Sequence, residues 1–96
     1  MKGYWIIFGS DIIDPKAQQE YSELWTSIGE KYSAKVRLLD PGVLVESEFS
    51  TRVLAVEFPS YKHATACYID PAYSRAKQFA LRAYKREVII IEGDLA

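Results

Sequence analysis

Two segments of this sequence, one near each end of the chain, are apolar at every position. Residues 4–8 (Tyr-Trp-Ile-Ile-Phe) and 88–91 (Val-Ile-Ile-Ile) consist of aromatic and β-branched side chains, which are typical of β-strands. Because successive side chains of a strand point to opposite faces of the sheet, both faces of these strands are apolar. Residues 53–58 repeat the pattern, with Glu57 as their only charged side chain. A sheet with one face in water alternates apolar and polar residues, so the sequence predicts a sheet covered on both sides.

Two Asp-Pro pairs mark the starts of helices. Asp14 and Asp70 can each accept hydrogen bonds from free backbone N–H groups of a first turn, and proline suits the first helical position. After the first pair, apolar residues recur at spacings of three and four and predict one buried helix face: Ala17, Tyr21, Leu24, Trp25, Ile28 and Tyr32. Ser60 predicts the start of a second helix, which runs to about Ile69. That helix breaks at the second pair and restarts with a face of Ala72, Ala76, Phe79, Ala80 and Ala83.

The order of elements is therefore strand, helix, strand, strand, helix, strand. Strands are expected at residues 3–9, 35–39, 52–58 and 87–92, and Val43 to Glu48 is expected to continue or re-enter the sheet as a hairpin arm. The most economical arrangement is an α+β, ferredoxin-like βαββαβ fold, a four-stranded antiparallel sheet with the helices on one face. A chain of 96 residues suits a single domain over positions 1–96.

This arrangement leaves the second apolar face of the sheet open. An open apolar patch of that size is unusual on a soluble monomer, and face-to-face packing of two such sheets about a twofold axis would bury it. We therefore expect a homodimer formed through the sheet face. The alternative is that the segment from Val43 to Glu48 and the tail of the chain cover this face.

Composition and charge argue against several partners and locations. The formal net charge is −1, from 12 basic and 13 acidic residues without a basic run, so we expect no nucleic-acid binding. The first apolar segment stops at Gly9, too early for a signal-peptide core, and no segment is long enough to span a bilayer. A single cysteine, Cys67, fits a reducing, cytoplasmic location. One histidine and one cysteine cannot build a structural zinc site, so we expect no metal and no cofactor.

Several motifs resemble those of a known family. They are Lys2-Gly3-Tyr4-Trp5-Ile6, Asp14-Pro15 followed by Tyr21, Glu57-Phe58-Pro59-Ser60, Tyr68, Asp70-Pro71-Ala72-Tyr73, Arg82 and Ile91-Glu92-Gly93. Together they cover nearly the whole chain and resemble domain-of-unknown-function family 1330 (DUF1330), a mostly bacterial group. The resemblance implies the dimeric α+β barrel fold, whose superfamily also includes cofactor-free monooxygenases, muconolactone-isomerase-like enzymes and haem-binding relatives of chlorite dismutase. Kinship of fold does not carry function.

Two positions depart from the family pattern. Tyr32-Ser33-Ala34 stands where members often have Tyr-Gly-Gly, and Cys67 stands where the residue before Tyr68 is often tryptophan. Both positions are expected near the cleft between helices and sheet, so relatives are a weaker guide to a ligand of this chain.

Four side chains are candidates for binding a ligand: Tyr21, Trp25, His63 and Arg82. Tyr21 and Trp25 share one stripe of the first helix, and aromatic side chains with polar tips can line a small-ligand cleft. An aromatic stripe of this spacing is also typical of a plain core. Arg82, which the family resemblance marks, can clamp a carboxylate with two hydrogen bonds or form a surface ion pair with an acidic residue such as Glu87.

Three residues, one of them the candidate His63, have alternative chemical interpretations. His63 lies four positions before Cys67, so a helix places both on one face. They form either a nucleophilic cysteine–histidine pair or a core cysteine near an exposed histidine. Glu57, inside an apolar strand, is either a general base with a raised pKa or the partner of an arginine or lysine across the dimer.

These features favour a homodimer that binds a small aromatic or carboxylate-bearing molecule in a cleft between helices and sheet. Two alternatives stay open: a cofactor-free monooxygenase- or isomerase-like enzyme that uses the same cleft, and a structural dimer with no small-molecule site. No combination of residues in the sequence identifies a catalytic group.

Overall fold

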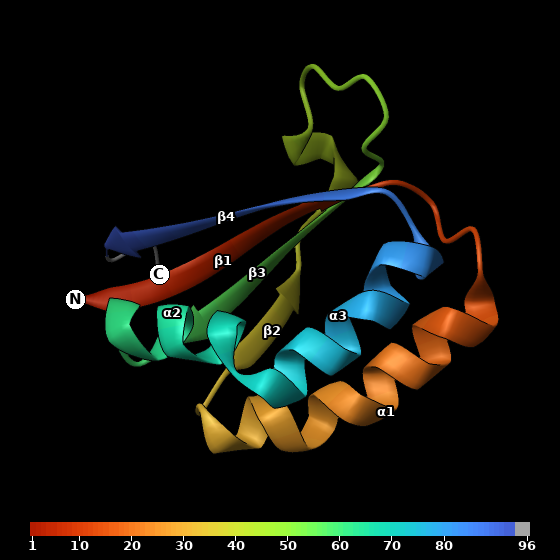
Figure 1. Cartoon of the computed structure of the whole chain (residues 1–96). Helices are drawn as coiled ribbons and strands as arrows, with labels where there is room; N and C mark the ends of the chain where they lie inside the picture. The colour runs from red at the N-terminus through yellow and green to blue at the C-terminus, as the bar shows by residue number, and fades with distance from the viewer. Residues whose placement is uncertain (94–96) are drawn as a thin grey trace.

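The computed structural model of the chain describes residues 1–93 and contains a four-stranded antiparallel sheet in the order β2-β3-β1-β4 (Figure 1). The strands are β1 (Lys2–Gly9), β2 (Lys35–Leu38), β3 (Arg52–Phe58) and β4 (Arg86–Gly93). The helices are α1 (Pro15–Lys31), α2 (Tyr61–Ile69) and α3 (Pro71–Ala83), and all three lie on one side of the sheet. This confirms the predicted ferredoxin-like fold. Within residues 1–93, no helix is both long enough and apolar enough to cross a membrane.

The helices begin at the residues that the sequence predicts. The side chain of Asp14 accepts a hydrogen bond from the backbone N–H of Ala17, and Ser60 accepts one from His63. Asp70 closes α2 and caps α3, because its side chain accepts a hydrogen bond from the N–H of Ala72. The second helix therefore breaks at Asp70, as predicted.

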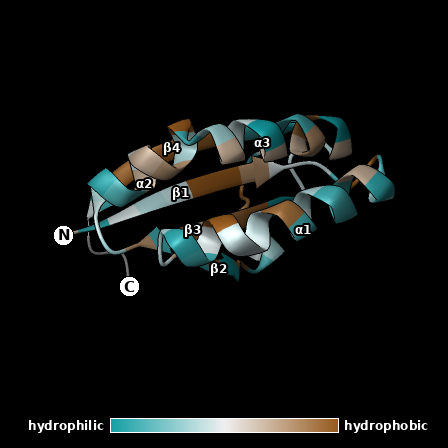
Figure 2. Ribbon diagram, turned by 60° about the horizontal axis from the view of Figure 1, so that its bottom comes forward, coloured by the Kyte–Doolittle hydropathy of each residue, from teal (hydrophilic) through white to brown (hydrophobic). Residues whose placement is uncertain are grey.

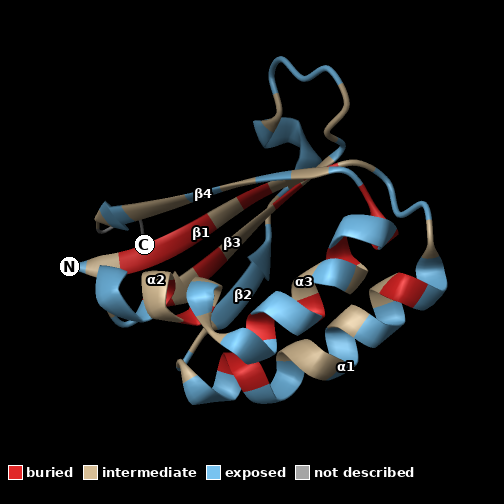
Figure 3. Ribbon diagram, in the orientation of Figure 1, coloured by how far each residue is buried: buried red, intermediate tan, exposed pale blue. Residues whose placement is uncertain are grey.

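The core lies between the helices and the near face of the sheet, and Trp5 is at its centre. Trp5 is fully buried, its indole N–H donates to the carbonyl oxygen of Ala64 at 2.9 Å, and its ring contacts four other aromatic rings: Trp25, Phe58, Tyr68 and Tyr73. β1 is buried over most of its length (Figure 3). The start of α2 lies directly on β1, because a Cβ atom at Gly3 would be 2.5 Å from the carbonyl oxygen of Ser60. Position 3 therefore requires glycine.

The predicted hairpin arm is wrong. Residues 43–48 form no strand; Pro41–Val43 is a single 3-10 turn, and the rest of the segment is irregular. Short-range hydrogen bonds account for the difference. The side chain of Asp40 accepts from the N–H of Gly42, and the Ser47 hydroxyl both donates to the carbonyl of Ser50 and accepts from its N–H. Such bonds compete with a sheet ladder for the backbone groups.

The face of the sheet opposite the helices, which we call the open face, is mostly apolar in β1, β3 and β4. β1 becomes hydrophobic along its C-terminal half (Figure 2). By strand alternation and register, the open face carries Tyr4, Ile6, Phe8, Val53, Ala55, Glu57, Glu87, Ile89 and Ile91. The segment between β2 and β3 rises on this side (Figure 1) and, with Leu44 and Phe49, borders a hollow beside Phe8. Ile89 stays 48% exposed, so this segment covers only part of the face. The tail, residues 94–96, lies outside the described residues.

Candidate functional site

A cavity of about 160 Å³ lies between α1 and the near face of the sheet. Its apolar wall is formed by six side chains from β1, α1, β2 and β3: Trp5, Ile7, Trp25, Val36, Leu54 and Val56. Five polar side chains also line it: Gln18, Tyr21, Ser22, Arg52 and Tyr84. The stacked rings of Tyr21 and Trp25, one helical turn apart, have centroids 6.5 Å apart and an interplanar angle of 14°. Two of the four candidate ligand residues, Tyr21 and Trp25, therefore meet at this cavity.

Two arginines stand on the helix-facing side of the sheet at one end of the cavity. Arg52 of β3 and Arg86 of β4 are the two register partners of Gly9 in β1, so they flank a position without a side chain. The ring of Tyr84 fills that position, because a Cβ atom at Gly9 would be 2.5 Å from its Cε2. The Arg52 guanidinium carbon lies 4.6 Å from the centre of the same ring, within the range of a cation–π contact.

Each guanidinium is only partly hydrogen-bonded. Arg52 Nε donates to the carbonyl oxygen of Ser10 at 3.3 Å, and Arg86 Nη2 donates to the hydroxyl of Tyr73 at 2.8 Å. Among the described residues, three buried side-chain polar atoms have no hydrogen-bond partner: Gln18 Oε1, Arg52 Nη2 and Arg86 Nη1. Within residues 1–93, neither arginine forms an ion pair with a carboxylate. We call Gln18, Arg52 and Arg86 the arginine cluster.

Two tyrosines connect the arginine cluster to the core. The hydroxyls of Tyr21 and Tyr73 are 3.2 Å apart, and the Arg86 guanidinium carbon lies 5.7 Å from the centre of the Tyr21 ring. Burial raises the pKa of both phenols above the usual value. Both therefore stay protonated at neutral pH and act as hydrogen-bond groups rather than bases.

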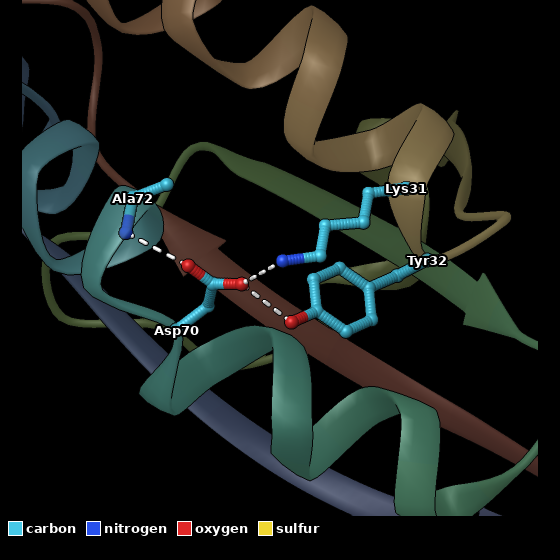
Figure 4. A network of polar contacts seen from close by, with 4 residues as sticks. All are labelled: Lys31, Tyr32, Asp70 and Ala72. Carbon is cyan, nitrogen blue, oxygen red and sulfur yellow. Dashed lines mark hydrogen bonds and ion pairs between the residues drawn. The ribbon is translucent and has the colours of Figure 1, made fainter.

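A second polar cluster joins the C-terminal end of α1 to the break between α2 and α3 (Figure 4). One Asp70 carboxylate oxygen accepts from the N–H of Ala72, and the other accepts from Lys31 Nζ at 2.9 Å and from the Tyr32 hydroxyl at 2.5 Å. Hydrogen bonds from Tyr32, Lys31 and Ala72 lower the pKa of Asp70 to about 2. In this capping cluster (Lys31, Tyr32, Asp70 and Ala72), both carboxylate oxygens have partners.

The structure places the other two candidates away from the cavity. His63 is exposed in the first turn of α2, and its Nδ1 lies 2.6 Å from the Ser60 hydroxyl. Arg82 is exposed on α3 with its guanidinium carbon 4.7 Å from the centre of the Phe79 ring, and within residues 1–93 no ion pair joins it to Glu87. Neither residue lines the cavity.

The surroundings of Cys67 and Glu57 indicate structural roles rather than catalytic ones. Cys67 is fully buried, and burial raises the pKa of its thiol to about 12, so little of it is thiolate at neutral pH. Glu57 lies on the open face and pairs with Lys2 of the same chain, with Nζ 3.2 Å from the carboxylate. Within residues 1–93, no group of three or more His, Cys, Asp or Glu side chains is arranged to hold a metal ion.

The sequence does not reveal the arginine cluster, because each arginine occupies a position where charged residues are common. Arg52 is the first residue of a strand and Arg86 the first of another, positions where charge is common. Strand alternation offers the one usable indication, since Arg52 shares its face with Leu54, Val56 and Phe58. A charged side chain on the core-facing register of a strand marks a position worth examining.

Known structures share this fold at low sequence identity. A protein of unknown function from Rhodopseudomonas palustris aligns with a TM-score of 0.72 and 16% identity over 99% of this chain and 84% of the other. A dimeric ferredoxin-like protein of unknown function from Jannaschia sp. CCS1 aligns at 0.69 and 12% identity over 97% and 100% of the two chains. SnoaB, a cofactor-independent oxygenase from Streptomyces nogalater, aligns at 0.60 and 7% identity over 99% and 95%. At these identities the likeness shows the fold alone.

Sequence comparison identifies the family more directly. No curated protein matches the chain. The model of the domain of unknown function DUF1330 matches residues 2–94. The predicted family is thus confirmed, and the chain belongs to the DUF1330 family.

Proposed function

We propose that the protein is a cytoplasmic homodimer in which each chain binds a small aromatic or carboxylate-bearing molecule in the cavity between α1 and the sheet. The observation that carries the proposal is the wall of this cavity, where aromatic rings from α1 and β1 adjoin polar atoms that lack partners. Ligand sites are mostly apolar, with a few placed polar groups that fix orientation. A plain core leaves few such groups unpaired.

The lining of the cavity favours binding over turnover. In the described part of the chain, no carboxylate, imidazole or amine lines it, and Tyr21, one of its two tyrosines, has a raised pKa. A general base needs a proton-accepting group within hydrogen-bond reach of the substrate. The oxygenase activity of SnoaB belongs to that protein; here, an enzyme reaction would require the ligand to supply its own reactive group.

The open face supports the homodimer. It presents the 48% exposed Ile89, and its Ile6 and Ala55 line a hollow of about 230 Å³ next to β2. Charges on the two sheet edges are complementary, with Lys35 and Arg37 on β2 and Glu87 on β4. A twofold axis parallel to the strands would set the basic edge of one sheet against the acidic edge of the other. Similar folds from Jannaschia and Thermobifida fusca are described as dimeric.

Thermal unfolding with a panel of single-ring aromatic acids and phenols tests the binding. A ligand that binds only the folded state raises the melting temperature by mass action. Val36→Phe, which narrows the cavity from the edge strand, should abolish the shift, and mass spectrometry of the incubated ligand should find it unchanged. Leu38→Phe is the matched control, because Leu38 is exposed on the same face of β2 but does not line the cavity. A panel without any shift would overturn the binding proposal.

Light scattering on a sizing column tests the dimer. The expected mass is twice the 11.0 kDa of the chain, and Ile89→Arg on the open face should halve it. Leu81→Arg changes another exposed apolar side chain, on the outer side of α3, and should leave the mass unchanged. A wild-type monomer at micromolar concentration would contradict the dimer.

A further inference from the structure

The arginine cluster has the composition of an anion site. Arg52 Nη2 is a buried donor without an acceptor, and Arg86 Nη1 is a second one across Gly9. Arginine stays charged in proteins, so two positive charges lie on the core side of the sheet without a carboxylate partner in residues 1–93. A buried donor without an acceptor destabilises the fold, and a bound anion would remove that deficit.

Only one of the two arginines faces the cavity. Arg52 lines it together with Gln18. Arg86 does not line it; its guanidinium carbon lies 5.7 Å from the centre of the Tyr21 ring, and its Nη2 donates to the Tyr73 hydroxyl. The Arg52 side chain is already oriented by the Tyr84 ring and by the hydrogen bond from Nε to Ser10. A preoriented guanidinium loses little freedom when it binds an anion, so Arg52 is the anchor and Arg86 adds positive potential.

The size of the cavity limits the rest of the ligand. Its volume is about 160 Å³, and an apolar protein cavity of about 150 Å³ holds one benzene molecule. The rings of Trp5, Trp25 and Tyr21 border this volume and offer faces and edges for contact with another aromatic ring. The space therefore fits one six-membered ring with a small substituent.

We propose that the ligand is a single-ring aromatic carboxylate whose carboxylate accepts a hydrogen bond from Arg52 Nη2 while its ring lies against Trp25. The inference rests on the proposed function and narrows its ligand to one class. Gln18 lines the same cavity as Arg52, and the orientation of its amide group decides whether it can donate to the ligand.

Calorimetric titration with benzoate and its neutral isostere benzamide tests the anchor. Wild-type protein should bind benzoate more tightly than benzamide. Arg52→Gln should weaken benzoate affinity by about 10- to 100-fold, the range for a hydrogen bond to a charged group. The affinity for benzamide should change little. Arg82→Gln removes the same charge from the exposed side of α3 and should leave benzoate affinity unchanged. If Arg82→Gln weakens benzoate and Arg52→Gln does not, the inference is wrong.

A second variant keeps the test decisive if Arg52→Gln does not fold. Gln18→Glu places a carboxylate of nearly the same shape in the cavity that Arg52 lines. The folded protein then supplies its own anion and should lose benzoate binding while retaining benzamide binding. Equal benzoate affinity in wild type and Gln18→Glu would overturn the inference. Equal binding of benzoate and benzamide by the wild type would overturn it too, and would leave the proposed function standing. If no member of the aromatic panel binds, both proposals fall.

Discussion

The two polar clusters of this protein, at opposite ends of α1, differ in whether their groups have partners. In the capping cluster, Asp70 receives three hydrogen bonds and both of its oxygens are satisfied. In the arginine cluster, three buried atoms lack hydrogen-bond partners within residues 1–93. A polar group that is satisfied within the fold stabilises it, whereas one left unsatisfied costs free energy unless something else binds it. The capping cluster therefore belongs to the architecture, and the arginine cluster is where a ligand would act.

The largest effect on stability is expected at Asp70. Asp70→Ala removes the cap of α3 and leaves the Tyr32 hydroxyl without its acceptor, so the melting temperature should fall by on the order of 10 °C. Asp40→Ala is the matched control, because Asp40 also precedes a proline but caps only the short 3-10 turn. Circular dichroism on heating measures both variants. Equal melting temperatures would mean that the capping cluster adds nothing beyond a local turn.

The stabilisation that Asp70 provides should disappear in acid. The pKa of Asp70 is lowered to about 2 in the folded protein, against about 3.9 for an unfolded aspartate. A lowered carboxyl pKa stabilises the fold above the unfolded value, and the gain is lost as the pH falls through the folded value. The gap in melting temperature between wild type and Asp70→Ala should be constant down to about pH 5 and close toward pH 2. A gap of the same size at pH 2 would contradict the assignment.

A smaller change in stability, of opposite sign, is expected for a substitution at Ser33, beside the capping cluster. Ser33 has a φ of 54°, in the left-handed region, and directly follows the C-cap of α1. Glycine adopts this conformation without strain, so Ser33→Gly should raise the free energy of unfolding by about 1 kcal/mol. Ser27→Gly, inside the same helix, should lower it by a similar amount. Urea unfolding measures both; a destabilised Ser33→Gly would show that the serine side chain itself is needed.

The smallest effect on stability is expected at Arg52. Arg52→Met gives up the contact with Tyr84 and the bond to Ser10, but it also removes a buried, partly unsatisfied charge. These effects oppose each other, so the free energy of unfolding should change by less than about 1 kcal/mol. Urea unfolding of Arg52→Met beside Asp70→Ala makes the comparison direct. A loss as large as that of Asp70→Ala would make Arg52 a structural residue and remove the contrast between the clusters.

The fold was predictable because its determinants are local. Strand periodicity at residues 4–8 and 88–91 and the caps at Asp14, Ser60 and Asp70 are each legible within a few residues. The error at Val43 to Glu48 came from apolar composition, which resembles a strand while Asp40 and Ser47 bind the backbone locally. There, turn chemistry prevailed over β propensity.

The candidate site was only partly predictable. Helical spacing places Tyr21 and Trp25 on one stripe, and both line the cavity. The environment of Arg52 depends on Gly9 and Tyr84, which are distant in sequence and meet only through the sheet register and the end of α3. His63 and Arg82 carry the right chemistry, but they lie on outward sides of their helices, and a single sequence does not distinguish such positions from inward ones.

The indole pair in the wall of the cavity gives the protein a built-in optical reporter. The chain has two tryptophans, and both line the cavity with ring centroids 5.6 Å apart. All of the tryptophan emission therefore originates at the cavity. A ligand that touches Trp25 alters the surroundings of both indole rings. Occupancy is thus readable from intrinsic fluorescence and near-ultraviolet circular dichroism without a label.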